Sequence, residues 1–157
     1  MAREENMGLA PWGALGGGTF KTEQQRASQS KEGRQVAASD AAVKVSKVLE
    51  EIAREKGTAL TSVALAYVLH KSPYVFPIVG GRSIDHLRGN IEALGLHLGR
   101  EDIRRIEEAV PFDLGFPHNF LWRGDGAPEN PEDVWLSALG GTTDYVPLPR
   151  PIKPTQE

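Results

Sequence analysis

Residues 74–94 read YVFPIVGGRSIDHLRGNIEAL, a strand–turn–helix pattern. The apolar and partly β-branched run Val75–Val79 predicts a short buried strand. Ser83 is a favourable N-cap residue, and the apolar residues that follow at i, i+4 and i+7 predict a helix that buries one face: Leu87, Ile91 and Leu94. A strand that leads through a tight turn into a helix is one β/α unit of a parallel sheet.

The turn between this strand and helix has the composition of an anion site. Gly80 and Gly81 allow backbone amides to approach a ligand closely, and the start of the helix adds unpaired N–H groups and a partial positive charge. Arg82 places a cation beside them. These features favour phosphate binding. Two glycines also occur in turns that need only tight packing, so the residues alone leave both interpretations open.

A second β/α unit comes earlier in the chain. Gly8–Pro11 is a strand candidate, and a glycine-rich loop follows at Trp12–Gly18. The polar segment 19–39 is predicted to be a long flexible loop, because it is rich in Gln, Ser and Lys and lacks a helical apolar pattern.

Two helices are predicted between the two strands. The first covers Asp40–Lys56, has an apolar stripe at helical spacing, and ends at Gly57. The second starts at a cap formed by Thr61 or Ser62, runs to about His70, and is apolar on most faces, as expected of a helix packed against a sheet. The alternation of strands and helices predicts two consecutive units of a parallel α/β fold.

The remaining sequence predicts one more helix and a tail. The helix covers Arg100–Val110, with acidic residues in its first turn. Residues 1–121 are therefore expected to form the folded part, and residues 122–157 an irregular tail, because prolines recur throughout it.

Composition narrows the possible functions. The chain has 157 residues and a net charge of −3, which argues against a general nucleic-acid or membrane-surface binder. It contains no cysteine, which excludes disulfides and thiolate metal sites, and no His/Asp/Glu cluster has metal-ligand spacing. No apolar run is long enough to span a bilayer. A soluble, cytoplasmic protein is the expectation, and its oligomeric state cannot be predicted.

Three blocks in this order resemble the aldo-keto reductases, in the branch of fungal aryl-alcohol dehydrogenases and norsolorinic acid reductases. They are GLAPWGALGGG at 8–18, VGGRS at 79–83 with His86-Leu87 and Asn90-Ile91 downstream, and PFDLGFPHNFL at 111–121. The resemblance implies a (β/α)₈ barrel. Because such a barrel needs roughly 250 residues, this chain is expected to hold only the carboxyl-terminal part, two β/α units with an extra helix. A shortened gene product is one explanation that the resemblance suggests.

The resemblance also implies NADP as cofactor and a set of residues that hold it. Trp12 would stack on the nicotinamide, Gly13, Leu15 and Gly17 would line the pyrophosphate, Gly80, Arg82 and Ser83 would bind the 2′-phosphate, and His86 and Asn90 would meet the adenine. Many relatives carry Gln at the position of His86 and Glu at that of Gly89, which puts the adenine contacts in question. Each residue also has a simpler explanation: a core Trp, a surface Arg, a helix cap, or solvated polar side chains.

The catalytic Tyr, Lys, Asp and His of the family lie on earlier strands, so no catalytic residue is expected here. Tyr67, Tyr74 and Tyr145 do not lie in that catalytic context. The expected function is that of an NADP-dependent oxidoreductase, which interconverts aldehydes or ketones and alcohols in fungal secondary metabolism, without its catalytic tetrad. The alternative is a non-catalytic NADP(H)-binding remnant, or a truncated product, that associates with a full-length relative.

Overall fold

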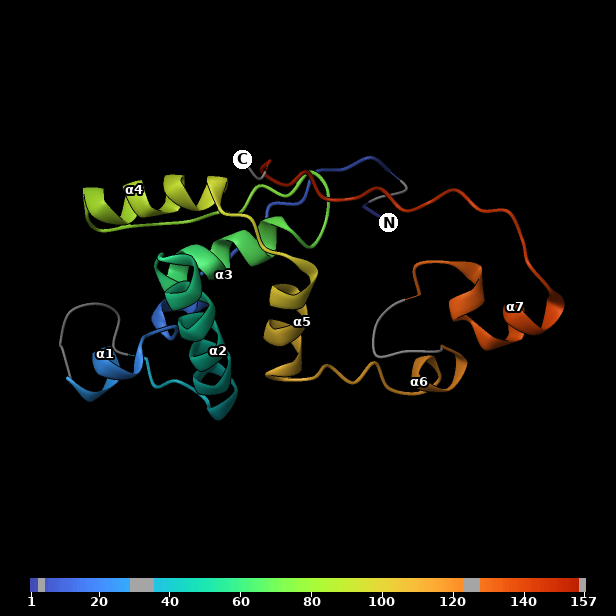
Figure 1. Ribbon diagram of the computed structural model, residues 1–157, viewed down its shortest axis with the longest axis horizontal. Coiled ribbons are helices and arrows are strands. Elements are labelled where there is room, and N and C mark those ends of the chain that lie inside the picture. The colour runs from blue at the N-terminus through green and yellow to red at the C-terminus, as the bar shows by residue number, and fades with distance from the viewer. Residues whose placement is uncertain (3–4, 29–35, 123–127, 156–157) are drawn as a thin grey trace. The chain divides into compact units, whose positions relative to one another are not determined.

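The computed structural model describes residues 1–2, 5–28, 36–122 and 128–155. The chain divides into two compact units. The first comprises Met1–Val110 together with Arg150–Glu157, and the second comprises Pro111–Pro149. The residues predicted to bind the cofactor all lie in the first unit. Figure 1 shows the helices of this unit, α1 to α5.

Two parallel segments cross the first unit. Leu9 bridges Val75 and Trp12 bridges Ile78, both in parallel orientation. The Leu9 N–H donates to the Tyr74 carbonyl at 2.9 Å, and the Phe76 N–H donates to the Leu9 carbonyl at 2.7 Å. The predicted parallel pairing is confirmed, but only as isolated bridges rather than the predicted strands. Pro11 explains the interruption, because it has no N–H to continue the ladder.

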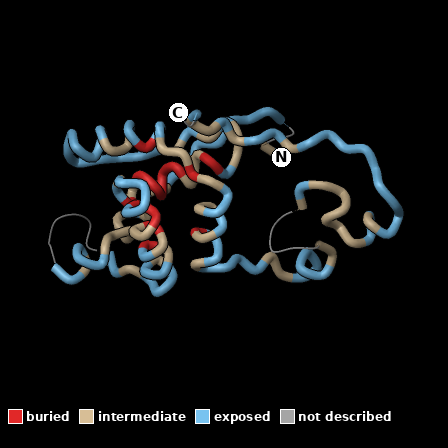
Figure 2. Tube along the Cα trace, in the orientation of Figure 1, coloured by how far each residue is buried: buried red, intermediate tan, exposed pale blue. Residues whose placement is uncertain are grey.

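The core lies between α2 (Asp40–Lys56) and α3 (Leu60–Leu69) (Figure 2). The bounds predicted for α2 are confirmed, and Gly57 ends the helix with φ +65°, in the left-handed region. The N-cap of α3 is Ala59, so the prediction of Thr61 or Ser62 as cap was wrong. Both residues lie inside the helix, where burial of its apolar face outweighs their preference for caps. The buried core includes Leu49, Ile52, Ala53, Leu60, Val63, Ala64, Ala66, Leu98 and Ile106.

Helix α5 (Arg100–Glu108) completes the core and is tied to α2 by ion pairs. Arg105 donates to both carboxylate oxygens of Glu55, at 2.8 and 3.0 Å. The Lys56 ammonium lies 3.0 Å from Asp102. Burial alone would raise the pKa of Asp102, but the Gly99 N–H and the Lys56 charge lower it below its ordinary value. The helix is two residues shorter than predicted.

Helix α4 (Ile84–Glu92) follows the second parallel segment and runs into the short 3-10 helix η2 (Ala93–Gly95). Ser83 caps α4 as predicted, because its hydroxyl accepts from the His86 N–H at 3.3 Å. The predicted burial of its apolar face is wrong for this chain, since the face is between 56% and 71% exposed: Ile84, Leu87, Ile91 and Leu94. Both α4 and η2 contact α3, and Ala93 of η2 is buried there. The apolar face finds no partner among the described residues.

Regular structure also occurs where the sequence predicted none. Helix α1 (Glu23–Ala27) lies in the predicted flexible loop and starts with a capping box formed by Thr22 and Gln25. The remainder of that loop includes residues 29–35, which lie outside the described residues, as do 123–127 and 156–157 of the predicted tail.

The second unit contains α6 (His118–Leu121), the 3-10 helix η3 (Pro131–Asp133) and α7 (Trp135–Gly140). An antiparallel bridge joins Trp122 to Val134, and the Phe120 and Trp135 rings meet edge to face at 5.8 Å. The part of the chain that was predicted to be irregular therefore includes a helix, α7, and an aromatic contact. Beyond α7, the described residues 142–155 have no helix or strand.

Candidate functional site

Two glycine-containing loops begin at the same end of the parallel pair. The first loop follows Trp12 and the second follows Val79. Because Trp12 bridges Ile78 in parallel orientation, the two segments end side by side, and both loops leave from their carboxyl ends. In α/β folds with parallel strands, ligands bind at this end.

The first loop is a sequence of tight turns. Gly13 and Gly17 have φ values of +82° and +61°, which only glycine adopts readily. The Gly16 N–H donates to the Gly13 carbonyl at 2.9 Å, and the loop continues into the 3-10 helix η1 (Gly16–Gly18). Leu15, just before this 3-10 helix, is half-buried. The indole of Trp12 is 80% exposed, so the interpretation of Trp12 as a core residue does not hold for this chain.

The second loop contains two glycines with different surroundings. A Cβ atom at Gly81 would lie 2.9 Å from the Cβ of His86, so the packing of this turn requires glycine there. A Cβ atom at Gly80 would meet no atom within 4 Å. Packing therefore explains Gly81 and leaves the Gly80 backbone open to solvent.

The polar residues of the second loop surround the start of α4. Arg82 is exposed, and within the described parts of the chain its guanidinium forms no ion pair. His86 folds back over the turn, where its Nδ1 accepts from the Arg82 N–H at 3.5 Å. Asn90 lies one turn further along α4 and is half-buried. Ser83 and His86 thus have local structural roles, whereas the exposed Arg82 side chain has none among the described residues.

This arrangement is suited to an anion rather than a metal. Amide N–H groups at the start of α4, an exposed guanidinium and the open backbone at Gly80 are donors for phosphate oxygens. Within residues 1–2, 5–28, 36–122 and 128–155, no three His, Cys, Asp or Glu side chains gather as metal ligands would. None of the helices described there is long and apolar enough to cross a membrane.

One cluster of titratable side chains was not predicted. The Tyr67 hydroxyl donates to Glu107 at 3.3 Å, and the Lys71 ammonium contacts the same carboxylate and lies 5.8 Å from the centre of the Tyr67 ring. Burial, together with the charge and hydrogen bond of Glu107, raises the pKa of Tyr67 to about 12. A phenol with a raised pKa is a poor general acid, so this cluster is better explained as a link between α3 and α5. Tyr67 and Glu107 are 40 positions apart, and no local sequence signal predicts their contact.

The chain is similar in sequence to proteins of one known family. The profile of the Aldo/keto reductase family matches residues 1–111. Norsolorinic acid reductase B of Dothistroma septosporum is 49% identical over 164 residues, which cover 99% of this chain and 42% of that protein. The putative aryl-alcohol dehydrogenase YFL057C of Saccharomyces cerevisiae is 43% identical, over 92% of this chain and 99% of its own length. A solved thermostable aldo-keto reductase, Tm1743, aligns over 69% of this chain and 32% of its own, with a TM-score of 0.48 and 23% identity.

The two parallel segments with their helices are thus units of a β/α barrel. More specifically, the chain belongs to the aldo/keto reductase family, as the family profile and the yeast relative show. It spans less than half the length of the norsolorinic acid reductase that it matches, in agreement with the prediction of a carboxyl-terminal part of the barrel. The family as a whole uses NADP(H) and acts on small carbonyl compounds or alcohols.

Proposed function

We propose that this chain forms the part of an NADP-dependent oxidoreductase that holds the adenosine phosphate end of the cofactor. The observation that carries the proposal is the parallel bridge between Trp12 and Ile78, since it brings both glycine loops to one end of the fold. The open backbone at Gly80 and the exposed Arg82 fit a phosphate group.

Different residues would bind different parts of the cofactor. Arg82, with the α4 N-terminus and the Gly80 backbone, would hold the 2′-phosphate, while Gly13, Leu15 and Gly17 would lie along the pyrophosphate. Trp12 would stack on the nicotinamide, and His86 and Asn90 would border the adenine. The bound cofactor supplies a hydride, and the substrate class is an aldehyde or ketone or the corresponding aryl alcohol, by analogy with the relatives named norsolorinic acid reductase and aryl-alcohol dehydrogenase.

The proposal assigns no general acid to this chain. A carbonyl that accepts a hydride needs a proton at its oxygen, and Tyr67, with a pKa of about 12 and its hydroxyl on Glu107, is not suited to donate it. Cofactor binding without turnover is therefore expected of the chain alone. This is also what the alternative, a non-catalytic NADP(H)-binding remnant, requires, so binding is the property to test first.

The test is the affinity for NADPH and NADH, measured by titration of intrinsic tryptophan fluorescence. NADPH should bind more tightly, and Arg82→Ala should remove most of that preference. A charge-assisted hydrogen bond contributes about 1.5–3 kcal/mol, or about 10- to 100-fold in affinity. Arg88→Ala is the matched control, because Arg88 is also an exposed arginine but lies in the second turn of α4, outside the glycine loop that precedes the helix. Equal affinities for the two cofactors in the unmodified chain would contradict the proposal.

A second pair of variants separates ligand contact from folding. Gly80→Ala should weaken NADPH binding without lowering stability, because the added methyl meets no protein atom. Gly95→Ala is its control, since a Cβ atom there also meets nothing within 4 Å and Gly95 is far along the chain from the turn. If both variants bind NADPH like the unmodified chain, the Gly80 backbone does not contact the cofactor.

A further inference from the structure

Residues 150–155 form a strap that belongs to the first unit and contacts the loop between η2 and α5 (red in Figure 1). The Lys153 ammonium donates to the Leu98 carbonyl at 3.1 Å. Nδ1 of His97 donates to the Pro154 carbonyl at 3.2 Å. Within the described residues, these two hydrogen bonds are the ones that join the strap to the rest of the unit. The strap is therefore held at one short loop.

A buried histidine, His70 at the end of α3, contacts the same loop. Its side chain is 7% exposed, and its ring meets the His97 ring edge to face with 6.1 Å between centres. Nδ1 of His70 lies 2.5 Å from the Ala66 carbonyl and carries the proton, so Nε2 is free to accept from the Leu98 N–H at 3.5 Å. Leu98 thus uses its N–H for His70 and its carbonyl for the strap.

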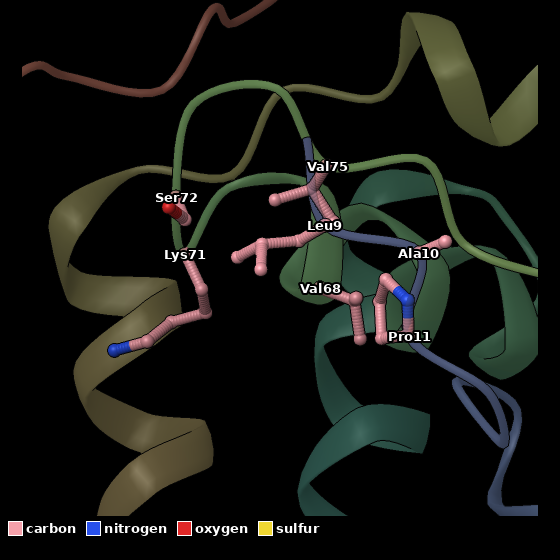
Figure 3. A pocket seen from close by; sticks show the side chains of 7 residues that line it. All are labelled: Leu9, Ala10, Pro11, Val68, Lys71, Ser72 and Val75. Atoms are coloured by element: carbon pink, nitrogen blue, oxygen red, sulfur yellow. The ribbon is translucent and has the colours of Figure 1, made fainter. Parts of the chain in front are cut away.

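The surroundings of His70 favour the neutral ring while the strap is bound. Burial lowers the pKa of His70, and the charges of Lys153 and His97 lower it further. The next cation along the chain, Lys71, extends towards α5 (Figure 3), where it pairs with Glu107. Among the described residues, no carboxylate bonds the His70 ring. A positive charge on this ring would therefore lie uncompensated beside Lys153.

We propose that the strap is released in acid: it stays bound while His70 is neutral and detaches when His70 takes up a proton. Protonation of Nε2 turns an acceptor into a donor that faces the Leu98 N–H, and it adds a second positive charge where Lys153 is bound. Release moves Lys153 away from the ring, so the released state binds the proton more readily and acid favours release. His97 is not the switch, because its Nδ1 donates to the Pro154 carbonyl whether the ring is neutral or charged.

Release would change how the second unit is attached. Pro111–Pro149 lies between α5 and the strap in sequence, so the chain connects this unit to the first unit at both ends while the strap is bound. When the strap detaches, the connection at Val110 is the one that remains. The buried core between α2 and α3 contains no residue of the strap and should stay folded. Acid would thus free one end of the second unit without unfolding the first, whether or not a cofactor is bound.

The experiment follows the strap of the full chain with a spin label. The chain has no cysteine, so Ile152→Cys gives a single labelling site in the strap, at a side chain that is 79% exposed. Electron paramagnetic resonance should show a restricted label at about pH 7.5 and a large mobile fraction at about pH 5. The ratio of mobile to restricted label should rise by up to about tenfold per pH unit, the limit for one proton. A label at Lys47→Cys, an exposed position of α2, is the control for unfolding and should give the same spectrum throughout.

Variants in the labelled strap background assign the effect to single side chains. His70→Gln stays neutral and should keep the label restricted in acid, whereas His97→Gln retains an N–H donor and should still release the strap. Lys153→Met removes the charge that opposes the His70 proton, so the ratio should change less with pH; this variant leaves His70 in place and tests the proposal even if His70→Gln is unstable. Mobility that does not depend on pH, an undiminished response in Lys153→Met, or simultaneous mobilisation of the label on α2 would each overturn the proposal.

Discussion

Replacing Ile52 by alanine should lower the free energy of unfolding far more than replacing Ile91 by alanine, although both are isoleucines in the apolar stripe of a helix. Ile52 is 0% exposed and packs in the core between α2 and α3, whereas Ile91 is 58% exposed on α4. Truncation of a fully buried isoleucine to alanine costs about 2–5 kcal/mol, because the removed atoms no longer contribute their burial and a cavity remains in their place. At Ile91 the change should stay within about 0.5 kcal/mol, since little contact is lost and alanine favours helix.

The assay is urea unfolding followed by far-UV circular dichroism. The midpoint should fall strongly for Ile52→Ala, fall slightly for Ile52→Val, at about 0.5–1.5 kcal/mol, and remain unchanged for Ile91→Ala. Equal losses at both positions would refute the arrangement described here, because they would mean that the α4 stripe is buried in the free chain. Self-association is excluded as the cause of such a result by repeating the measurement at several protein concentrations.

Three further outcomes follow from the structure. Gly57→Ala should lower the free energy of unfolding by about 1–2 kcal/mol, because Gly57 has φ +65° and the added methyl meets no atom, so that only backbone strain is added. Urea unfolding of this variant and of the control Gly95→Ala measures the effect. Stability should fall as the pH drops below about 6.5, because burial lowers the pKa of His70, with Lys153 and His97 adding to the effect, and folding favours the neutral ring. In His70→Gln, the difference between the urea midpoints at about pH 7.5 and about pH 5 should be smaller. The chain alone should not oxidise NADPH with aryl aldehydes above background, and turnover that disappears in Tyr67→Phe would show that an acid was overlooked.

The pH dependence has a clear structural basis. Nδ1 of His70 lies 2.5 Å from the Ala66 carbonyl and must carry the proton, which leaves Nε2 to accept from the Leu98 N–H at 3.5 Å. Protonation of Nε2 would place two donors against each other beside the Lys153 ammonium, which itself bonds the Leu98 carbonyl at 3.1 Å. A group with a depressed pKa of this kind stabilises the fold fully above its unfolded value, and the contribution is lost as the pH falls.

The elements that the sequence predicted well depend on local signals. Helix α2 has an apolar stripe and a glycine stop, and both act within one turn of the residues concerned. Parallel pairing followed from the order of strands and helices. The helix α1 was missed although its signal is local too, since Thr22 and Gln25 stand at capping-box spacing in a segment whose composition resembles a loop.

What the sequence did not predict depends on contacts between distant residues. The spacing on α4 identifies which face is apolar but not whether another element covers it, because the covering element belongs to a different part of the chain or to another chain. Likewise, the contact of Tyr67 with Glu107 depends on how α3 and α5 pack, which neither helix encodes alone. The predicted fold class was therefore correct, whereas the predicted burial of one helix was not.

The two glycines of the second loop show how the structure sharpens the candidate site. From sequence, Gly80 and Gly81 were equivalent, and close packing or ligand contact could explain either. The Cβ atom of His86 now accounts for Gly81, because no larger side chain fits at 2.9 Å. No described atom lies within 4 Å of a Cβ atom at Gly80, so packing gives no reason for glycine there. A methyl group at Gly80 meets no side chain or backbone of the described fold, so weaker NADPH binding without a change in stability would report on contact with the ligand.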